Sequence, residues 1–494
     1  MAENREDENQ FRAARLEKRE ALKQLGVDPY PYAFQRTAEA KSLDQRYAAL
    51  PAGTTTEDKV AVAGRIRAIR NSGMFIDLHD DSGKIQVFSH KDFLAPEQLA
   101  IVRLLDLGDI IGVEGVVRRT PRGELTVNAT RVEVLAKALL PLPEKYHGLA
   151  DIETRYRQRY LDLIVNEESR ETLRKRSRII EAMRRLLIER GFLEVETPML
   201  HVIPGGATAK PFVTHHNALD MELYLRVAPE LHLKRLLVGG LSDKLFEINR
   251  NFRNEGLSPR HNPEFTSLEL YQAYVDYTAM MELTETLVAE IAREVLGGTR
   301  IAYGSATIEL AGPWPRRSMA ELVREKTGVD FLDLADDAAA RAAARRLNIE
   351  VAENAGWGRA LEAAFAARVE DTLVQPIHIT GFPREISPLA KADRNDPRLT
   401  ERFETYINGW EVANAFSEIN DPIDQRQRFE AQMRERERGD EEAQRLDADY
   451  VTALEYGMPP AGGLGIGIDR LVMLLTDSPS IRDVIAFPTM RPRG

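Results

Sequence analysis

The sequence predicts an α+β protein with a small β-rich N-terminal domain and a larger mixed domain. Residues 60–135 hold five short strand-like runs separated by turn signals, which is typical of a small barrel. Beyond residue 177, amphipathic helical stretches alternate with strands, and two alanine-rich segments, 335–347 and 359–369, favour helix. A chain of 494 residues is long enough for two or three domains.

Composition narrows the class of protein. The chain has 43% hydrophobic and 29% charged residues, no apolar run near the ~20 residues of a membrane helix, and no N-terminal signal sequence. We therefore expect a cytoplasmic protein without a membrane partner. Cysteine is absent, which excludes disulfides, thiolate metal sites and a cysteine nucleophile. With a net charge of -11, any nucleic acid has to be bound by local basic patches.

Residues 1–59 are predicted to form an N-terminal helical arm. The first 25 residues are charged, with sparse apolar positions, as in a solvent-exposed helix. Two interpretations stay open, an arm without chemistry or an arm that touches phosphates. The basic residues of the second interpretation are Arg12, Arg15, Lys18, Arg19 and Lys23.

Residues 60–140 are predicted to form a five-stranded OB barrel. The expected strands are 60–70, 74–80, 84–89, 109–120 and 125–135, with a helix at about 92–105 after the third. Such barrels bind single-stranded nucleic acid through basic and aromatic side chains. Arg65, Arg67, Arg70, Phe75 and Gln86 lie on the first three strands. From this domain alone, Phe75 either stacks on a base or lies in the barrel core.

Residues 141–176 are predicted to be a linker and residues 177–494 a large second domain. A helix at 177–190 ends at Gly191, and a strand at 195–197 stops at Pro198. A helical insertion is expected at about 318–375, beginning with a capping box at Ser318 and Glu321. Strands return near 376–382 and 402–419, and a glycine-rich strand at 463–468 precedes an apolar run.

Two distant segments have the composition of a nucleotide site. Residues 252–269 hold Arg253, Glu255, His261 and Phe265, and residues 463–470 form a glycine-rich strand that ends in Arg470. The chain has no GxxxxGK[ST] sequence, so a triphosphate would have to be held in another way. Two separated arginines supply charge-assisted, bidentate donors, and an aromatic ring can cover adenine.

A pair of glutamates predicts a metal site. Asn408 and Gly409 form a hairpin signal, and a two-residue loop there places Glu404 diagonally opposite Glu411, within roughly 7–8 Å. Two such carboxylates either remain solvated on an open sheet or share a cation. Beside a triphosphate, Mg²⁺ is the expected cation.

The ordered motifs resemble a known family. Segments 190–198, 252–255 and 463–470 resemble motifs one, two and three of the class II aminoacyl-tRNA synthetases, and a preceding OB barrel resembles their aspartyl, asparaginyl and lysyl subgroup. The runs 202–207, 228–231, 260–265 and 387–391 are similar to those of bacterial lysyl-tRNA synthetases. The resemblance implies a catalytic domain built on an antiparallel sheet flanked by helices, and a homodimer formed through motif one.

The implied activity is that of a lysine–tRNA ligase. The lysine carboxylate attacks the α-phosphate of ATP and releases pyrophosphate, and the lysyl group then passes to the 3′-terminal adenosine of tRNA(Lys). Neither step needs a protein nucleophile, because positioning and charge stabilisation carry the catalysis. Mg²⁺ is the implied cofactor.

The resemblance also assigns roles to individual residues. ATP-binding residues are implied to be Arg253, Glu255, His261, Asn262, Phe265, Glu404, Glu411, Gly467 and Arg470, of which Arg253 and Arg470 are catalytic and Glu404 and Glu411 bind the metal. Lysine is bound by Gly206, Glu230, Tyr271, Asn414 and Glu418, and the anticodon by Arg70, Phe75 and Gln86. Strict strand alternation puts Glu418 and Glu411 on opposite faces, so a bulge or turn must lie between them.

Three rival functions remain to be distinguished. A ligase that attaches lysine to a protein would lack the barrel, and a non-catalytic nucleic-acid-binding relative would have lost one or more of Arg253, Glu255, Glu411 and Arg470. An aspartyl or asparaginyl ligase fits the fold, but does not fit the combination of Glu230, Tyr271 and Glu418; an aspartate side chain in particular needs a cation in the pocket.

Overall fold

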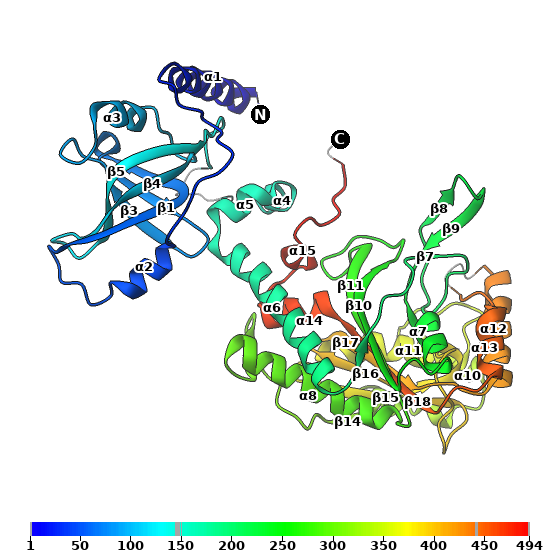
Figure 1. Cartoon of the computed structure of the whole chain (residues 1–494). Coiled ribbons are helices and arrows are strands. Elements are labelled where there is room, and N and C mark those ends of the chain that lie inside the picture. Colours follow the sequence, from blue (N-terminus) through cyan, green and yellow to red (C-terminus); the bar gives the residue numbers. More distant parts are fainter. Residues whose placement is uncertain (1, 144–148, 150, 440–442, 493–494) are drawn as a thin grey trace. The chain divides into compact units, whose positions relative to one another are not determined.

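The computed structural model describes residues 2–143, 149, 151–439 and 443–492. The chain divides into two compact units, Met1–Leu149 and Ala150–Gly494 (Figure 1). Residues 144–148 and 150 of the predicted linker lie outside the described residues. Among the described helices, none is both long and apolar enough to cross a membrane.

The first unit is a closed five-stranded barrel. Its strands follow the order β1-β2-β3-β5-β4, and a helix lies between β3 and β4 in sequence, as the OB pattern predicted. The elements are β1 (Thr55–Arg70), β2 (Phe75–His79), β3 (Lys84–Phe88), α3 (Pro96–Arg103), β4 (Ile110–Arg119) and β5 (Leu125–Ala136). β1 starts before the predicted residue 60, because its pairing with β4 continues from Lys59 to Thr55 across an irregularity. Ile66, Ile76 and Leu78 are fully buried in the barrel core.

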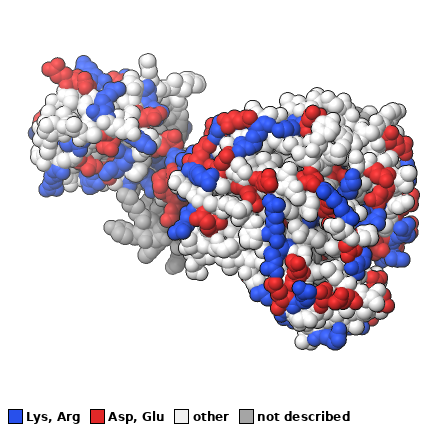
Figure 2. Space-filling model, turned by 90° about the horizontal axis from the view of Figure 1, so that it is seen from below, with Lys and Arg blue, Asp and Glu red and all other residues white. Residues whose placement is uncertain are grey.

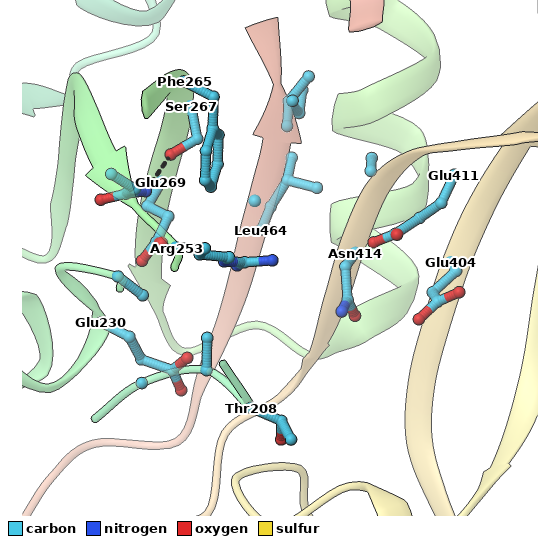
Figure 3. Close-up of a pocket in the computed structure, with 18 of the residues that line it drawn as sticks. Thr208, Glu230, Arg253, Phe265, Ser267, Glu269, Glu404, Glu411, Asn414 and Leu464 are labelled. Carbon is cyan, nitrogen blue, oxygen red and sulfur yellow. Dashed lines mark hydrogen bonds between the residues drawn. The ribbon is translucent and has the colours of Figure 1, made fainter. Parts of the chain in front are cut away.

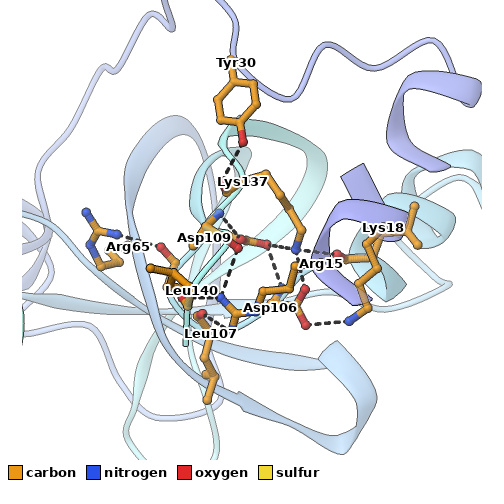
Figure 4. A network of polar contacts seen from close by, with 12 residues as sticks. Arg15, Lys18, Tyr30, Arg65, Asp106, Leu107, Asp109, Lys137 and Leu140 are labelled. Atoms are coloured by element: carbon orange, nitrogen blue, oxygen red, sulfur yellow. Dashed lines mark hydrogen bonds and ion pairs between the residues drawn. The ribbon is translucent and has the colours of Figure 1, made fainter. Parts of the chain in front are cut away.

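Two helices, α1 (Ala2–Gln24) and α2 (Ala40–Arg46), precede the barrel. Lys18 donates to Asp106 at 2.6 Å, and the fully buried ammonium of Lys137 lies 2.5 Å from Asp106 and 2.7 Å from Asp109 (Figure 4). Arg15 donates to three backbone carbonyls, those of Leu107, Ala138 and Leu140. Arg15 and Lys18 therefore fasten α1 to the barrel, which gives both residues a structural role.

An eight-stranded sheet forms the centre of the second unit, in the order β14-β15-β16-β17-β18-β11-β10-β6. Its strands are β6 (Leu193–Glu194), β10 (Lys244–Phe252), β11 (Glu264–Ala273), β14 (Arg316–Ser318), β15 (Ile377–Pro383), β16 (Leu399–Ile407), β17 (Trp410–Ser417) and β18 (Ala461–Gly467). All pairs are antiparallel except β14 with β15 and β10 with β6. Small separate sheets contain β7 (Leu200–His201), β8 (Val213–His216), β9 (Met221–Leu225), β12 (Arg300–Tyr303) and β13 (Ala306–Glu309).

Helices cover this sheet, as expected for the predicted fold class (Figure 1). They are α4 (Ile152–Arg157), α5 (Arg159–Val165), α6 (Glu167–Glu189), α7 (Glu230–Val238), α8 (Tyr277–Leu296), α12 (Pro422–Glu437), α13 (Ala448–Glu455), α14 (Ile468–Leu475) and α15 (Ile481–Val484). α6, α8 and α14 share one hydrophobic core with the sheet, and α7, α12 and α13 belong to another. Leu268 and Leu270 of β11 pack into the first core, whereas Ser267, Glu269 and Tyr271 face a cavity on the other side of the middle strands.

The predicted insertion contains α9 (Met319–Thr327), α10 (Asp337–Arg346) and α11 (Trp357–Arg368), which have a core of their own. The capping box of Ser318 and Glu321 is confirmed. The strand expected at 195–197 is wrong, because pairing with β10 involves Leu193 and Glu194 and only the Val195 N–H continues it. The helix expected at 177–190 starts earlier, at Glu167, since the polar first turns are also helical.

Candidate active site

A cavity of about 390 Å³ lies over β10, β11, β17 and β18. It brings together every residue that the sequence predicted for ATP, metal and lysine. These residues are Gly206, Glu230, Arg253, Glu255, His261, Asn262, Phe265, Tyr271, Glu404, Glu411, Asn414, Glu418, Gly467 and Arg470. Their positions agree with one continuous site, while their individual roles stay predictions.

Arg253 projects into the middle of this cavity (Figure 3). It follows β10, and its backbone N–H donates to the Pro263 carbonyl at 2.9 Å, which closes the loop between β10 and β11. Its guanidinium carbon lies 5.1 Å from the ring centroid of Phe265. The buried Nε has no hydrogen-bond partner among the described residues. A planar cation with an unused buried donor is well suited to bind an anion.

A second cation lies where β18 meets α14. Arg470 donates to the backbone oxygen of Glu411 at 2.7 Å and to its carboxylate at 3.2 Å, and its Nη2 lies 3.2 Å from Nε2 of His261. Burial and the charge of Arg470 lower the pKa of His261, so the imidazole is neutral at pH 7. Arg253 and Arg470 thus offer hydrogen-bond donors to an extended polyphosphate, while Nε2 of the neutral imidazole accepts from Arg470 and its Nδ1–H faces Ser258.

The two glutamates predicted to hold a metal lie on one hairpin. Asn408 and Gly409 have φ angles of 54° and 69°, and Tyr406 pairs with Glu411, which confirms the predicted two-residue turn. Figure 3 shows Glu404 and Glu411 on the two neighbouring strands of this hairpin, on the same side as Asn414. Glu404 also accepts hydrogen bonds from Arg402 at 2.6 Å and from the Tyr406 hydroxyl at 2.8 Å. Burial and the neighbouring Glu411 raise the pKa of Glu404 to about 7.

The bulge that the sequence required is present in β17. Tyr406 pairs with Glu411, but Thr405 pairs with Ala413, so Val412 is the extra residue. From Ala413 onward the alternation is reversed, and Asn414 lies opposite Glu404. The same face therefore carries Glu411 before the bulge and Asn414, Phe416 and Glu418 after it.

Acidic side chains gather at the other end of the cavity. Glu230 begins α7, Tyr271 lies on β11, and Glu418 follows β17, and all three are buried. Oε1 of Glu418 has no hydrogen-bond partner among the described residues. Burial raises the pKa of Tyr271 well above its ordinary value, so its hydroxyl remains protonated. This end offers carboxylate acceptors to a ligand with cationic groups.

The barrel places its predicted nucleic-acid residues on the outer face. Phe75 is half-buried beside Phe88, with ring centroids 5.1 Å apart, while the neighbouring Ile76 points into the core. The interpretation of Phe75 as a core residue is therefore wrong. Arg70 makes a bidentate ion pair with Asp77, with distances of 2.9 and 2.7 Å. Gln86 accepts a hydrogen bond from Thr126 at 3.1 Å.

Comparison with known proteins agrees with this arrangement. A family profile described as tRNA synthetases class II (D, K and N) matches residues 151–491, and one described as an OB-fold nucleic acid binding domain matches residues 60–135.

The chain belongs to the class II tRNA synthetases.

Similar curated proteins extend over its whole length. The lysine–tRNA ligase of Rhizobium meliloti is 56% identical over 97% of this chain and 96% of its own length. The corresponding ligase of Carboxydothermus hydrogenoformans is 55% identical over 98% of this chain and 99% of its own length. That of Staphylococcus saprophyticus is 53% identical over the full length of both.

Four polar or small residues of this class II site were not predicted from the sequence. Lys234 lies one turn after Glu230 on α7, so helical spacing could have identified it. Glu269 lies between Phe265 and Tyr271 on the cavity face of β11, where alternation could have identified it. Burial raises the pKa of Glu269 well above its ordinary range, with Glu230 contributing.

The other two missed residues support their neighbours. Arg402 donates to Asn414 at 3.1 Å and to Glu404 at 2.6 Å, so it joins the predicted carboxylate-binding and metal-binding residues. Gly463 lies against Glu418 and Tyr271, and a side chain there would collide with both. No local sequence signal identifies Gly463 for this role, because the contact exists only in the folded sheet.

Proposed function

We propose that this chain is a lysine–tRNA ligase that forms lysyl-adenylate from lysine and ATP and then transfers the lysyl group to tRNA(Lys). The observation that carries the proposal is the buried pair Glu230 and Glu418 at one end of a class II cavity that holds Arg253 in its middle and Arg470 at its other end. Carboxylates in this position favour an amino acid with a cationic side chain. The curated ligases that match the whole chain support the same substrate.

Activation needs the lysine carboxylate and the α-phosphate to be held together despite their negative charges. We assign this role to Arg253, whose guanidinium lies between the two ends of the cavity. Phe265 would cover the adenine, Glu255 and Asn262 would contact the nucleotide, and His261 and Arg470 would bind the outer phosphates. Gly206 and Glu230 would hold the α-amino group, Asn414 the carboxylate, and Tyr271 and Glu418 the ε-ammonium group.

The residues present fit a magnesium ion. Glu404 and Glu411 supply two hard oxygen ligands beside the proposed phosphate site, and Mg²⁺ in nucleotide enzymes is commonly held by one or two carboxylates plus phosphate oxygens. Within the described residues no group of three or more His, Asp or Glu side chains is arranged to hold a metal alone. When bound, Mg²⁺ would neutralise charge on the phosphates. Gly467 would let the nucleotide approach the end of β18.

The barrel is proposed to bind the anticodon of tRNA, with Phe75 stacking on a base and Arg70 and Gln86 contacting its edge. An outward-facing aromatic residue on an OB barrel supports this role. On the face seen in Figure 2, basic and acidic residues are interspersed over the second unit. Because the chain has a net charge of -11, RNA has to be contacted through a local basic surface. A cytoplasmic location remains a prediction.

A homodimer is also proposed. Large apolar side chains around the predicted motif one are exposed in the single chain, with exposed fractions of 53% for Ile188, 46% for Leu200 and 62% for Val202. Such a group of apolar residues favours burial by a second subunit. Sedimentation velocity of the full chain would show a dimer, and a monomer at micromolar concentration would contradict this assignment.

We also propose a functional division of the chain into an arm (1–59), a barrel (60–140), a linker (141–176) and a catalytic domain (177–494).

ATP–pyrophosphate exchange with each of the twenty amino acids tests the substrate. We expect exchange with lysine and none comparable with aspartate or asparagine. Exchange with aspartate and not lysine would overturn the proposal. Charging of tRNA(Lys) with labelled lysine then tests the second step and distinguishes a tRNA ligase from a ligase that modifies a protein.

A further inference from the structure

The acidic residues at one end of the cavity contact a buried cation for which the mechanism above has no role. Lys234 on α7 is fully buried, and its ammonium nitrogen lies 2.5 Å from Oε1 of Glu230 and contacts Oε2 of Glu418. The ring centroids of Tyr271 and Phe416 lie 5.8 and 5.3 Å from the same nitrogen. Two carboxylates and two aromatic rings therefore surround one ammonium group.

Charge balance explains why a cation is needed there. Two buried carboxylates this close together cannot both remain ionised without compensation. Among the described residues, Lys234 is the only ion-pair partner of Glu230 and of Glu418. Burial alone would lower the pKa of Lys234, but the charges of Glu230 and Glu418 raise it above its ordinary value, so the ammonium stays charged.

The contact is also selective between the two oxygens of Glu418. The ammonium of Lys234 approaches Oε2 most closely, whereas Oε1 lies against Gly463 and Tyr271; both oxygens are buried, and neither has a hydrogen-bond partner of ordinary geometry among the described residues. Tyr271 is on the side that the proposed function gives to the ε-ammonium group of the substrate. Lys234 thus leaves one oriented oxygen unused at the place where a second ammonium would enter.

We propose that Lys234 is a positioning residue of the amino-acid site, which bridges Glu230 and Glu418 so that an oxygen of Glu418 stays ionised and oriented for the cationic side chain of the substrate. This inference rests on the proposed function of the cavity. When both carboxylates are ionised, above the pKa of about 8 of Glu418, the three side chains together carry one net negative charge, which a lysine side chain neutralises. An uncharged isostere such as norleucine leaves that charge unpaired in a buried site, so it is excluded.

The first test compares Lys234→Met with Lys244→Met in the full-length chain. Lys244 is a matched control, because it lies on β10 in the same unit and donates to the Arg190 carbonyl outside the cavity. In lysine-dependent exchange, we expect the KM for lysine to rise about 30-fold or more in Lys234→Met, as for truncation of one partner of a buried charge pair. The KM for ATP should stay within about twofold, and Lys244→Met should resemble the wild type.

An unchanged KM for lysine would overturn the inference. A lower KM would also overturn it, since that result would show that Lys234 competes with the substrate for the two carboxylates. Equal increases in the KM for lysine and for ATP would indicate a structural role only. The wild-type protein separates this inference from the proposed function, because failure of the wild type to exchange with lysine would refute the function itself.

A pH profile provides a readout that a structural role would not change. Burial raises the pKa of Glu418 to about 8, and Lys234 counteracts this rise. The groups that face this pair are Glu230 on α7, Glu269 and Tyr271 on β11, Arg402 on β16 and Tyr450 on α13. As pH rises and Glu418 ionises, the KM for lysine should decrease. Without Lys234, this decrease should occur at a pH that is higher by about one unit or more. An unshifted profile would contradict the inference.

If Lys234→Met does not fold, a second variant in which the ammonium group is restored chemically tests the same role. The chain has no cysteine, so Lys234→Cys introduces its one thiol. Alkylation with 2-bromoethylamine, verified by mass spectrometry, then rebuilds a side chain of lysine length that ends in an ammonium group. We expect the alkylated protein to recover most of the lysine affinity that Lys234→Cys loses. Complete alkylation without recovery would refute the role of Lys234.

Discussion

At the scale of single residues, the cavity combines cationic arginine and anionic glutamate side chains. Arg253 and Arg470 lie where phosphates are expected, and Glu230 and Glu418 lie where ammonium groups are expected. Burial strengthens each of these preferences, because an unpaired charge away from water is costly. The substrate that pairs all of them carries both anionic and cationic groups, as ATP and lysine do together.

Arg253→Ala should lower the rate of lysine-dependent exchange by about 10²–10³, the usual effect of losing one donor that stabilises developing charge. Arg250→Ala is the matched control, because Arg250 lies near the end of β10, shortly before Arg253, but does not line the cavity. Thermal unfolding should be similar for both variants. Near-normal exchange by Arg253→Ala would show that the guanidinium does not contact the reacting groups.

The pKa of Glu404 predicts how magnesium use depends on pH. Because burial and Glu411 raise this pKa to about 7, Glu404 is increasingly protonated below pH 7 and becomes a poorer metal ligand. The Mg²⁺ concentration for half-maximal exchange should therefore rise as pH falls from 8 to 6, by about tenfold at most.

Glu404→Gln is the comparison for this measurement. ATP phosphates also titrate near pH 6, so the difference between the two proteins is the readout. The variant should need more Mg²⁺ at pH 8 and show a smaller pH dependence. The same slope in both proteins would mean that Glu404 is not a ligand.

At the scale of elements, the β16–β17 hairpin organises the site. Its two-residue turn sets the pairing of Glu411, and the bulge at Val412 reverses the faces of the residues that follow. One strand can thus contribute Glu411 to the metal end of the cavity and Glu418 to the lysine end. A strand without the bulge would direct one of these carboxylates away from the cavity.

Gly409→Ala tests the turn. Gly409 has a φ of +69°, and an added Cβ would lie 3.3 Å from the Cα of Asp371, so we expect a loss of about 1–2 kcal/mol in unfolding free energy. Gly298→Ala is the control, because its added Cβ meets nothing within 4 Å and its φ is not left-handed. All three tryptophans, Trp314, Trp357 and Trp410, lie in the second unit, so their fluorescence during urea unfolding reports on that unit. Equal stability of both variants would contradict a strained turn.

At the scale of the whole molecule, the two units hold separate sets of predicted residues. The barrel holds the predicted anticodon residues, and the second unit holds all the residues predicted for ATP and lysine. A substitution confined to the barrel face should therefore affect tRNA and leave the activation of lysine unchanged.

Phe75→Ala should keep pyrophosphate exchange within about twofold of wild type but lower kcat/KM for tRNA charging by about tenfold or more, since stacking contributes about 1–3 kcal/mol per base. Tyr32→Ala is the control, because Tyr32 is a fully exposed aromatic residue of the same unit. Unchanged charging by Phe75→Ala would refute the role of this ring.

Features of the fold that depend on local patterns could be predicted from the sequence. Strand alternation and turn signals were sufficient for the succession of strands and helix along the barrel segment, the Asn408–Gly409 turn and the pairing of Tyr406 with Glu411, because each rests on neighbouring residues. The distant motifs were sufficient to identify the cavity residues as a set, since their chemistry is specific in combination.

Strand register and contacts between residues far apart in the sequence could be seen only in the folded chain. The bulge at Val412 depends on the register between β16 and β17. Lys234 lies between Glu230 and Glu418 because α7 packs beside the sheet, although Glu418 is far away in sequence. Arg15 and Lys18 looked like surface cations, yet they bind barrel groups about ninety residues or more away. Long-range packing determines which charges become buried neighbours, and local sequence patterns do not contain that information.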